Sequence, residues 1–367
     1  MTIADFAVPV AAAALITAGI IRMATTNQSE TPPPPYNSIT ERASGRTLTS
    51  DESHRSALKR IAEETLTAIR EGSYLYKGVD NDLKDAAKEA ESKTVFCSSN
   101  SSSIKQWASS TKPNPTNPTH SSPTHISILH ITTLDAARLL DNVYKSNPSE
   151  NGKTGILNFA SATKPGGGFK NGAEAQEESI ARSSTLYSSL NTEVAQRFYK
   201  VHKHENVENA EGYYSHSMIY SPNICIFRDD DGNWTYPFQV DVLSCAAVNA
   251  GEVRKTNGAI TAGQEVEIEK EMTERMGRIL YVFEQKGARN IILGTFGTGV
   301  FANSVTTVAR IWAHLLLVPE ARFKDSFDRV IFAITGEETF IKFQSAFNAW
   351  GQPRATGSGR TSNRWFS

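Results

Sequence analysis

The stretch from Asn158 to Ser184 constrains the fold of this chain more than any other, because a short apolar run leads through three consecutive glycines into a helical pattern. Thr154–Phe159 (TGILNF) is of strand type, and Lys164-Pro165 followed by Gly166 to Gly168 ends it. Glycines carry no Cβ, so their backbone amides can turn toward a ligand's oxygens. A strand, a glycine loop and a helix N-terminus in this order predict a phosphate site.

Two adjacent carboxylates follow this loop. Gln176, Glu177 and Glu178 come after seven intervening residues, in the first turns of the predicted helix, so they point toward whatever the loop holds. A lone glutamate at such a position usually only complements the helix dipole. The neighbouring glycines favour a functional interpretation here.

The pattern GGG, a short spacer and QEE, followed by ESIARSSTLYSSL from Glu178, resembles the signature of the poly(ADP-ribose) glycohydrolases in their compact microbial-type form. The resemblance covers roughly residues 51 to 350 and implies a macrodomain fold. It also implies hydrolysis of the O-glycosidic ribose–ribose bond of poly(ADP-ribose), with release of ADP-ribose. We find no His/Cys cluster in the sequence, and we expect neither a metal nor a cofactor.

The resemblance also implies roles for single residues. Conventional glycosidases place two separated carboxylates across the bond, which adjacent residues are unsuited to do. By the family's pattern Glu178 protonates the leaving 2′-oxygen and then activates water, and a neighbouring carboxylate and phosphates would raise its pKa for that role. Glu177 would hydrogen-bond the leaving ribose. The residues implied to bind substrate in this part of the chain are Ser161, Gly166, Gly167, Gly168 and Gln176.

Ser161 departs from the pattern, since relatives often carry Asn at this position. A hydroxyl reaches less far than an amide and has one donor hydrogen instead of two. We expect this difference to affect the rate and the substrate preference more than the class of reaction.

The stretch from Asn290 to Asn303 (NIILGTFGTGVFAN) is again an apolar strand that leads to glycines and then to a helix, with Asn303 predicted as the cap. Its G-x-x-G-x-G spacing is neither a dinucleotide fingerprint nor a Walker loop. GTGVF resembles the family's second phosphate loop, whose Phe would lie against the ribose. The residues implied to bind substrate here are Gly294, Gly297, Thr298, Gly299, Val300 and Phe301.

Strands alternate with helices from Ser127 to Trp350, which predicts a mixed sheet between two layers of helices. With the macrodomain fold that the resemblance implies, we expect a three-layer α/β/α macrodomain-like structure with additional N-terminal helices. We expect a catalytic domain over residues 51–350, in which 98–124 is a flexible insertion without periodicity. Residues 351–367 are expected to be a disordered tail. Apolar residues at helical spacing predict that Ile268, Met272, Met276, Ile279 and Phe283 are core residues of one long helix.

Residues 1–50 are predicted to be a weakly apolar and then disordered extension. Phe6–Ile21 holds 16 residues, fewer than a membrane span needs, and no basic residue precedes it, so an anchor or targeting segment is the less favoured interpretation. The Pro33–Tyr36 run has the polyproline character that WW-type domains bind, although we favour a spacer with an accidental tyrosine.

The amino-acid composition limits the kinds of partner that we expect this protein to bind. The net charge is −1, with 38 basic and 39 acidic residues, so no overall basic field favours nucleic acid. Cys97, Cys225 and Cys245 lack metal spacing, and we expect reduced, buried thiols in a cytoplasmic or nuclear protein. The expected partner is an ADP-ribose polymer or an ADP-ribosylated protein, and we expect a monomer.

The competing hypothesis is a macrodomain that binds ADP-ribose without cleaving it. Both glycine loops suit either function, whereas the paired carboxylates favour the hydrolase, because a pure binder gains nothing from negative charge beside an anion. A hydrolase of mono(ADP-ribose) on protein or nucleic acid is a further alternative. The sequence leaves open the substrate class, the residues that contact adenine and the role of residues 1–50.

Overall fold

The computed structural model describes residues 50–110, 124–148, 152–208, 212–256 and 261–350. These residues belong to a compact unit that runs from Thr49 to Ser367. The predictions for the N-terminal extension, the Pro33–Tyr36 run and the C-terminal tail lie outside the described residues.

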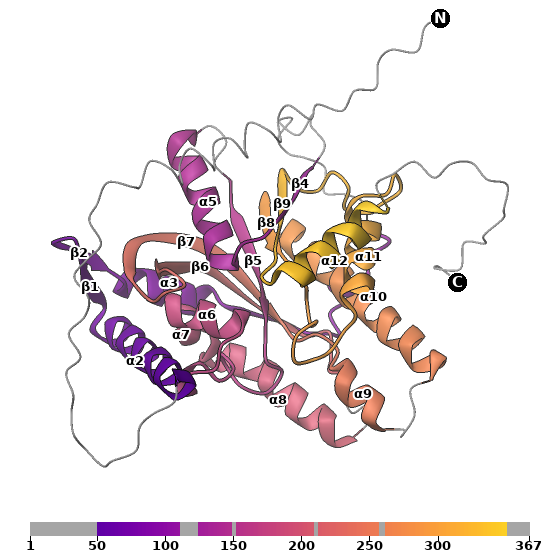
Figure 1. Ribbon diagram of the computed structural model, residues 1–367, viewed down its shortest axis with the longest axis horizontal. Coiled ribbons are helices and arrows are strands. Elements are labelled where there is room, and N and C mark those ends of the chain that lie inside the picture. The colour runs from indigo at the N-terminus through magenta and orange to yellow at the C-terminus, as the bar shows by residue number, and fades with distance from the viewer. Residues whose placement is uncertain (1–49, 111–123, 149–151, 209–211, 257–260, 351–367) are drawn as a thin grey trace, which may run out of the picture. The chain divides into compact units, whose positions relative to one another are not determined.

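A seven-stranded mixed sheet forms the centre of this unit, with strand order β3-β6-β7-β5-β8-β9-β4 (Figure 1). The strands from β7 to β4 in this order are parallel to their neighbours, whereas β6 is antiparallel to both β7 and β3. The strands are β3 (Val95–Cys97), β4 (His125–Leu129), β5 (Thr154–Phe159), β6 (Met218–Arg228), β7 (Trp234–Cys245), β8 (Asn290–Leu293) and β9 (Arg329–Ala333).

Both faces of the sheet are buried because apolar side chains alternate between two cores along its strands. In β5, Leu157 points to one core and Ile156 to the other, and in β8 the same holds for Ile291 and Ile292. One core is closed by α10 (Ala262–Gln285), α11 (Val305–Leu316) and α12 (Glu337–Asn348), and the other by α5 (Thr133–Ser146), α6 (Gln176–Ser183), α7 (Leu186–Leu190) and α8 (Glu193–Glu208). The predicted three-layer α/β/α arrangement is therefore confirmed.

The helices follow the apolar periodicity of the sequence. The core residues predicted for the long helix α10 are all buried, and its N-terminus has a capping box between Thr261 and Gln264. The helices of the described residues are α2 (Ser50–Glu71), α3 (Lys84–Lys93), α4 (Ser102–Lys105), α5 (Thr133–Ser146), α6 (Gln176–Ser183), α7 (Leu186–Leu190), α8 (Glu193–Glu208), α9 (Ala250–Thr256), α10 (Ala262–Gln285), α11 (Val305–Leu316) and α12 (Glu337–Asn348).

The N-terminal elements cover the loop that follows β5. Helix α2, one of the predicted additional N-terminal helices, packs Ala62 and Leu66 against Phe169 of that loop. The hairpin of β1 (Ser73–Tyr76) and β2 (Val79–Asp82) and the helix α3 were not predicted. Additional N-terminal helices are therefore present, and one of them supports the glycine loop.

The prediction of a flexible insertion over residues 98–124 is wrong for residues 98–110. Ile104 and Trp107 are buried in this segment, and the indole nitrogen of Trp107 donates to Glu274 Oε2 at 2.8 Å. The Trp107 ring also lies against Gly277 of α10 and stacks on Phe323. Two apolar side chains are enough to hold this polar segment against the domain. Two isolated apolar residues give no periodic pattern, so the sequence does not reveal this packing. Residues 111–123 lie outside the described residues.

The three cysteines are buried free thiols, as predicted. Burial raises the pKa of Cys225 and of Cys245 to about 12, so both remain uncharged thiols at neutral pH.

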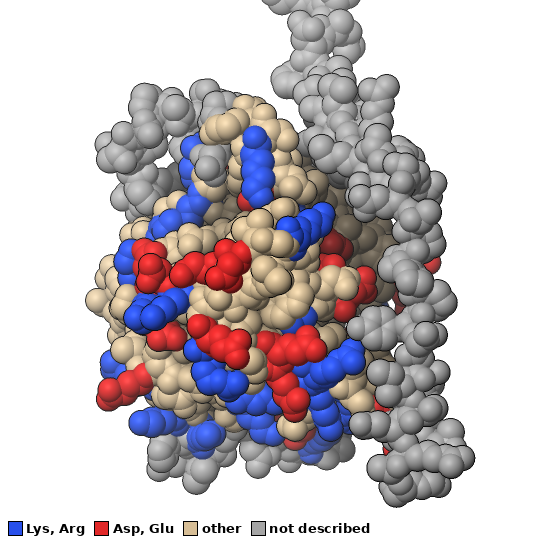
Figure 2. Space-filling view, turned by 90° about the vertical axis from the view of Figure 1, so that its left-hand side faces the viewer, with Lys and Arg blue, Asp and Glu red and all other residues tan. Residues whose placement is uncertain are grey.

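The surface of the described residues mixes charges of both signs. On the face that Figure 2 shows, Lys and Arg side chains are interspersed with Asp and Glu. This matches the near balance of basic and acidic residues in the whole chain. No helix in the described part of the chain has the length and apolarity that crossing a bilayer requires.

Candidate active site

The loop between β5 and α6 brings its glycines against both glutamates. Gly166 and Gly167 have φ angles of 66° and 57°, the left-handed region that favours glycine. A Cβ on Gly167 would lie 2.2 Å from Glu178 Oε1 and 3.1 Å from Glu177 Oε2. Only glycine at this position allows the two carboxylates to come so close to the loop.

Glu178 accepts a hydrogen bond from the backbone amide of Gly168 at 2.9 Å. Its side chain lies in the first turn of α6, as predicted, and is only half-buried. One oxygen is therefore held by the loop, and the carboxylate remains within reach of a ligand bound there.

Glu177 is buried, with 3% of its surface exposed. Its Oε2 accepts from the amide of Ser161 at 2.7 Å, and its Oε1 lies 3.4 Å from Asn158 Nδ2. Burial raises the pKa of Glu177 to about 8, against the opposing effect of the Ser161 amide, and the charge of Glu178 adds to the increase. At neutral pH Glu177 therefore holds its proton in the free protein.

The side chains of Gln176 and Ser161 form hydrogen bonds with the backbone of the protein itself. Gln176 Oε1 accepts from the Phe159 amide at 2.8 Å, and its Nε2 donates to the Leu157 carbonyl at 2.7 Å, so it joins α6 to β5. Ser161 Oγ accepts from the amides of Thr163 and Lys164 at 3.4 and 3.2 Å. Both side chains hold the backbone that surrounds Glu177 and Glu178, and their predicted contacts with substrate stay a prediction.

The sequence reasoning missed Asn158. This residue is fully buried at the end of β5, and its Nδ2 donates to Ser244 Oγ of β7 at 2.9 Å as well as facing Glu177. An amide side chain inside the apolar run TGILNF was the available signal, since a buried polar group needs partners.

The second loop, between β8 and α11, is held by Asn303. Its Nδ2 donates to the carbonyls of Val248 at 2.7 Å and Gly297 at 2.9 Å. Gly297 has a φ of 75°, and a Cβ there would lie 2.4 Å from the Cβ of Ala247. The prediction of Asn303 as the helix cap is wrong, because Ser304 caps α11 with its side chain and Asn303 is buried in these loop contacts.

The tip of the second loop is open. Val300 is 90% exposed, and Phe301 is half-buried. A Cβ on Gly299 would meet no atom within 4 Å, so Gly299 leaves open space rather than serving close packing. These residues are available to a ligand.

The sheet topology brings the two loops together. β5 and β8 are parallel neighbours, so both loops leave the same edge of the sheet. The rings of Phe159, at the end of β5, and Phe296, in the second loop, have centroids 5.8 Å apart. The predicted glycine loops therefore lie side by side, with Glu177 and Glu178 in the helix that follows the first.

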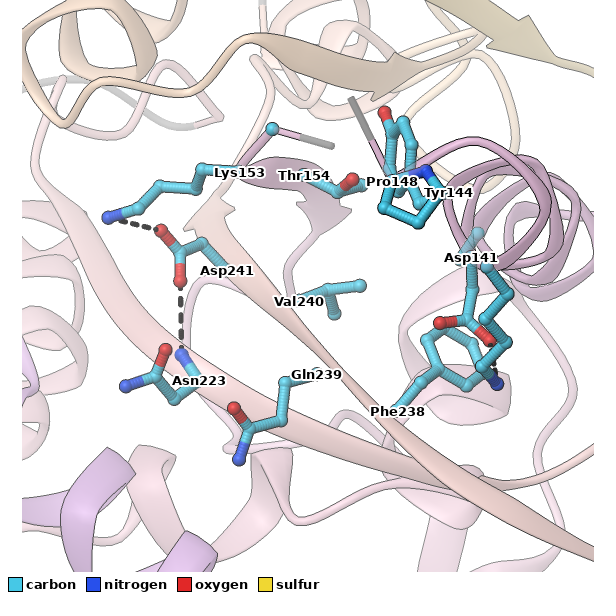
Figure 3. Close-up of a pocket in the computed structure, with 13 residues that line it drawn as sticks. Asp141, Tyr144, Pro148, Lys153, Thr154, Asn223, Phe238, Gln239, Val240 and Asp241 are labelled. Atoms are coloured by element: carbon cyan, nitrogen blue, oxygen red, sulfur yellow. Dashed lines mark hydrogen bonds and ion pairs between the residues drawn. The ribbon is translucent and has the colours of Figure 1, made fainter. Parts of the chain in front are cut away.

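A pocket of about 520 Å³ lies at the other end of β5 (Figure 3). Lys153 Nζ lies 3.1 Å from Asp241 there, and Asp241 also accepts from the amide of Asn223 at 3.0 Å. Lys145 in turn pairs with Asp141 at 2.6 Å. The charges of this pocket are thus paired with one another, and we place the candidate active site at the glycine loops.

Among the described residues, no group of three or more His, Cys, Asp or Glu side chains is arranged to hold a metal ion.

Comparisons with known proteins agree with this geometry. Residues 62–229 match the sequence model of a family described as microbial-type PARG, catalytic domain. No curated protein matches the chain.

Several solved structures match the chain along most of its length. The poly(ADP-ribose) glycohydrolase (PARG) from Thermomonospora curvata is 31% identical, with a TM-score of 0.68, and the match covers 80% of this chain and 99% of that one. The same enzyme bound to the inhibitor ADP-HPD is also 31% identical, with the same coverage and a TM-score of 0.67. The PARG from Deinococcus radiodurans in complex with ADP-ribose is 28% identical, covering 72% of this chain and 98% of that one, with a TM-score of 0.58.

Proposed function

Because this chain belongs to the family of microbial-type poly(ADP-ribose) glycohydrolases, we propose that it hydrolyses the ribose–ribose O-glycosidic bond of poly(ADP-ribose) through Glu178 as general acid and base. The chain is thus a glycosidase with a macrodomain-like fold. Similar proteins were solved with ADP-ribose or with ADP-HPD bound, and we expect a ligand of the same type to bind at the glycine loops.

The hydrogen bond between Gly168 and Glu178 carries this proposal. It places the glutamate at the loop whose geometry suits a phosphate, so the reacting ribose next to that phosphate lies within its reach. The second glycine loop lies beside the first and can bind the other phosphate of the diphosphate. A glutamate beside a pair of anion-binding loops suits hydrolysis better than simple binding.

The reaction proceeds in two proton transfers. Glu178 donates its proton to the leaving 2′-oxygen while the bond from the anomeric carbon to that oxygen breaks and an oxocarbenium-like ribose forms. The resulting Glu178 carboxylate then accepts a proton from water as the water oxygen bonds to the anomeric carbon. ADP-ribose is released, and Glu178 has regained its proton.

Glu177 supports this reaction as a neutral group. Its raised pKa of about 8 keeps it protonated at neutral pH, so it adds no negative charge beside the diphosphate. Its carboxyl group also faces Asn158 Nδ2 at 3.4 Å and the backbone of Gly166, and we propose that it bonds a hydroxyl of the leaving ribose. Its Oε2 meanwhile holds the Ser161 amide and with it the start of the loop.

To test the proposal, purified protein of residues 1–367 is incubated with labelled poly(ADP-ribose), and the products are then separated. Release of free ADP-ribose is the expected result. Parallel incubations with mono(ADP-ribosyl)ated protein and with ADP-ribosylated nucleic acid test the alternative substrates. Binding of ADP-ribose without turnover of any of the three substrates would identify a binding module instead.

A further inference from the structure

Tyr214 has a backbone conformation that its residue type disfavours. Four residues other than glycine have positive φ in the described part of the chain, namely Lys77, Tyr214, Asn223 and Ala302. Lys77 belongs to the two-residue turn of a hairpin, Asn adopts this conformation readily, and Ala302 is small. Tyr214, with a φ of 52°, is the bulky exception. Such strain persists only where the surroundings hold it, and it is concentrated at functional sites.

A buried arginine holds this conformation. Arg275 of α10 has no exposed surface, and its Nη2 donates to the carbonyls of both Tyr213 and Tyr214 at 2.8 Å. Its Nη1 donates to the carbonyl of Ala246, just after β7, at 3.0 Å. Charge-assisted hydrogen bonds of this kind are strong enough to offset backbone strain. The direction of the Tyr214 side chain is therefore set by the fold.

The topology places this segment at the edge of the sheet that carries the glycine loops. β6 is antiparallel to β7, with Met218 opposite Cys245. The residues that precede β6 consequently lie where β7 and its parallel neighbours β5 and β8 end. Tyr214 thus reaches the candidate active site from a part of the chain that contains none of the predicted site residues.

Two aromatic contacts place the Tyr214 ring beside the second loop. Its centroid lies 5.8 Å from that of Phe301, in the second loop. It also lies 5.6 Å from the centroid of the His202 ring, which belongs to α8. His202 Nε2 also lies 2.8 Å from Ser215 Oγ, which ties the segment to α8.

The Tyr214 side chain keeps its polar end available. The residue is half-buried, and its hydroxyl has no hydrogen-bond partner among the described residues. A tyrosine whose only task is packing needs neither a strained backbone nor a free hydroxyl. An aromatic face with a free hydroxyl suits a sugar, which presents apolar C–H groups beside hydroxyls.

We propose that Tyr214 is a substrate-positioning residue, whose ring and Phe301 together hold the ribose at the glycine loops while its hydroxyl bonds a ribose hydroxyl. This inference rests on the proposed function, because it takes ADP-ribose as the ligand of those loops. It adds a contact from a third segment of the chain, which the two loop motifs do not include.

Two variants of Tyr214 test the proposal, with the neighbouring Tyr213 as the matched control. Tyr214→Asn removes the ring but tolerates the left-handed backbone, and Tyr214→Phe removes only the hydroxyl. Tyr213 belongs to the same segment and bonds the same arginine through its carbonyl, but its ring lies near acidic residues of α10. Tyr213→Phe should therefore leave binding and turnover unchanged.

The measurements are ADP-ribose affinity by calorimetry, KM and kcat on poly(ADP-ribose), and the melting temperature. We expect Tyr214→Asn to weaken binding by about tenfold or more with a nearly unchanged melting temperature. Tyr214→Phe should raise KM by about fivefold, the effect of one lost hydrogen bond, with a smaller change in kcat.

Tyr214→Asn that binds ADP-ribose as well as wild type would overturn the inference. An equal loss in Tyr213→Phe would also overturn it, because the segment would then act only as a support. If the Tyr214→Asn variant does not fold, the Tyr214→Phe variant tests the proposal. An unchanged KM and an unchanged ADP-ribose affinity in Tyr214→Phe would then contradict it. A wild-type protein that neither binds ADP-ribose nor cleaves the polymer would instead refute the proposed function itself.

Discussion

The side chain of Glu178 and the backbone amide of Gly168 are joined by a 2.9 Å hydrogen bond, although they lie ten positions apart in the chain. Gly167 makes this possible, because any Cβ at that position would overlap the Glu178 carboxylate. The glycine loop and helix α6 therefore form one unit, in which the loop that suits phosphate also orients the proposed acid. This coupling leads to predictions that separate chemistry from binding.

Glu178→Gln should abolish most hydrolysis while preserving ADP-ribose binding. The amide keeps the size of the side chain but can neither give the proton to the leaving oxygen nor activate water, an effect of about 10²- to 10⁴-fold. Glu177→Gln is the matched variant and should be milder, because Glu177 is already neutral at neutral pH. Turnover of labelled polymer and calorimetric affinity measure the two effects. Full turnover in Glu178→Gln would exclude this residue from the mechanism.

Gly167→Ala and Gly297→Ala should each weaken ADP-ribose binding by about tenfold or more. The added Cβ would lie 2.2 Å from Glu178 in the first case and 2.4 Å from Ala247 in the second, and both positions have positive φ, so the loops must shift. Gly263→Ala in α10 is the control, since its nearest contact would be 3.9 Å away. Calorimetry with ADP-ribose measures the change. Wild-type affinity in both folded loop variants would place the phosphate site elsewhere.

Stability should decrease with rising pH because of Glu177. Its pKa is about 8 in the folded protein against an ordinary value of 4.5, so between these values the folded state binds a proton that the unfolded chain releases. Protonation of Glu177 therefore stabilises the folded state fully below its ordinary pKa of 4.5, and this stabilisation is lost as the pH rises through about 8. Glu177→Gln cannot ionise, so its melting temperature relative to wild type should rise from about pH 5 to about pH 8. A constant difference in calorimetric scans would contradict the raised pKa.

A chain of residues 50–367 should retain the specific activity of the full protein within about twofold, because α2 begins at Ser50 and its contacts with the loop start beyond that residue. A chain of residues 62–367 should bind ADP-ribose more weakly. It lacks Arg55, whose Nε donates to the Asn171 carbonyl of the glycine loop at 2.9 Å, and the buried Leu58. Arg55→Ala in the full chain separates this loop contact from general instability. Equal affinities in both truncated proteins would show that the first half of α2 does not support the loop.

Local patterns in the sequence predicted the elements that carry their own periodicity. The strand predicted over Thr154–Phe159 has the same bounds as β5, and the core face predicted for α10 is buried throughout. Burial of one face leaves a repeat of two in strands and of 3.6 in helices, which is visible without knowledge of the partner. Polar segments give no such repeat, which is why the anchoring of residues 98–110 by Trp107 was missed.

The sequence alone determined the two glycine loops, the position of Glu177 and Glu178 in the first turn of a helix, and the class of fold, because each depends on residues close together in the chain. The tertiary structure decided which loops adjoin, how deeply Glu177 is buried, and that Asn158, Arg275 and Tyr214 support the site. These features depend on strands and helices far apart in sequence that meet at one edge of the sheet. Burial and the pKa changes that follow from it are properties of that packed environment, and no local pattern of residues records them.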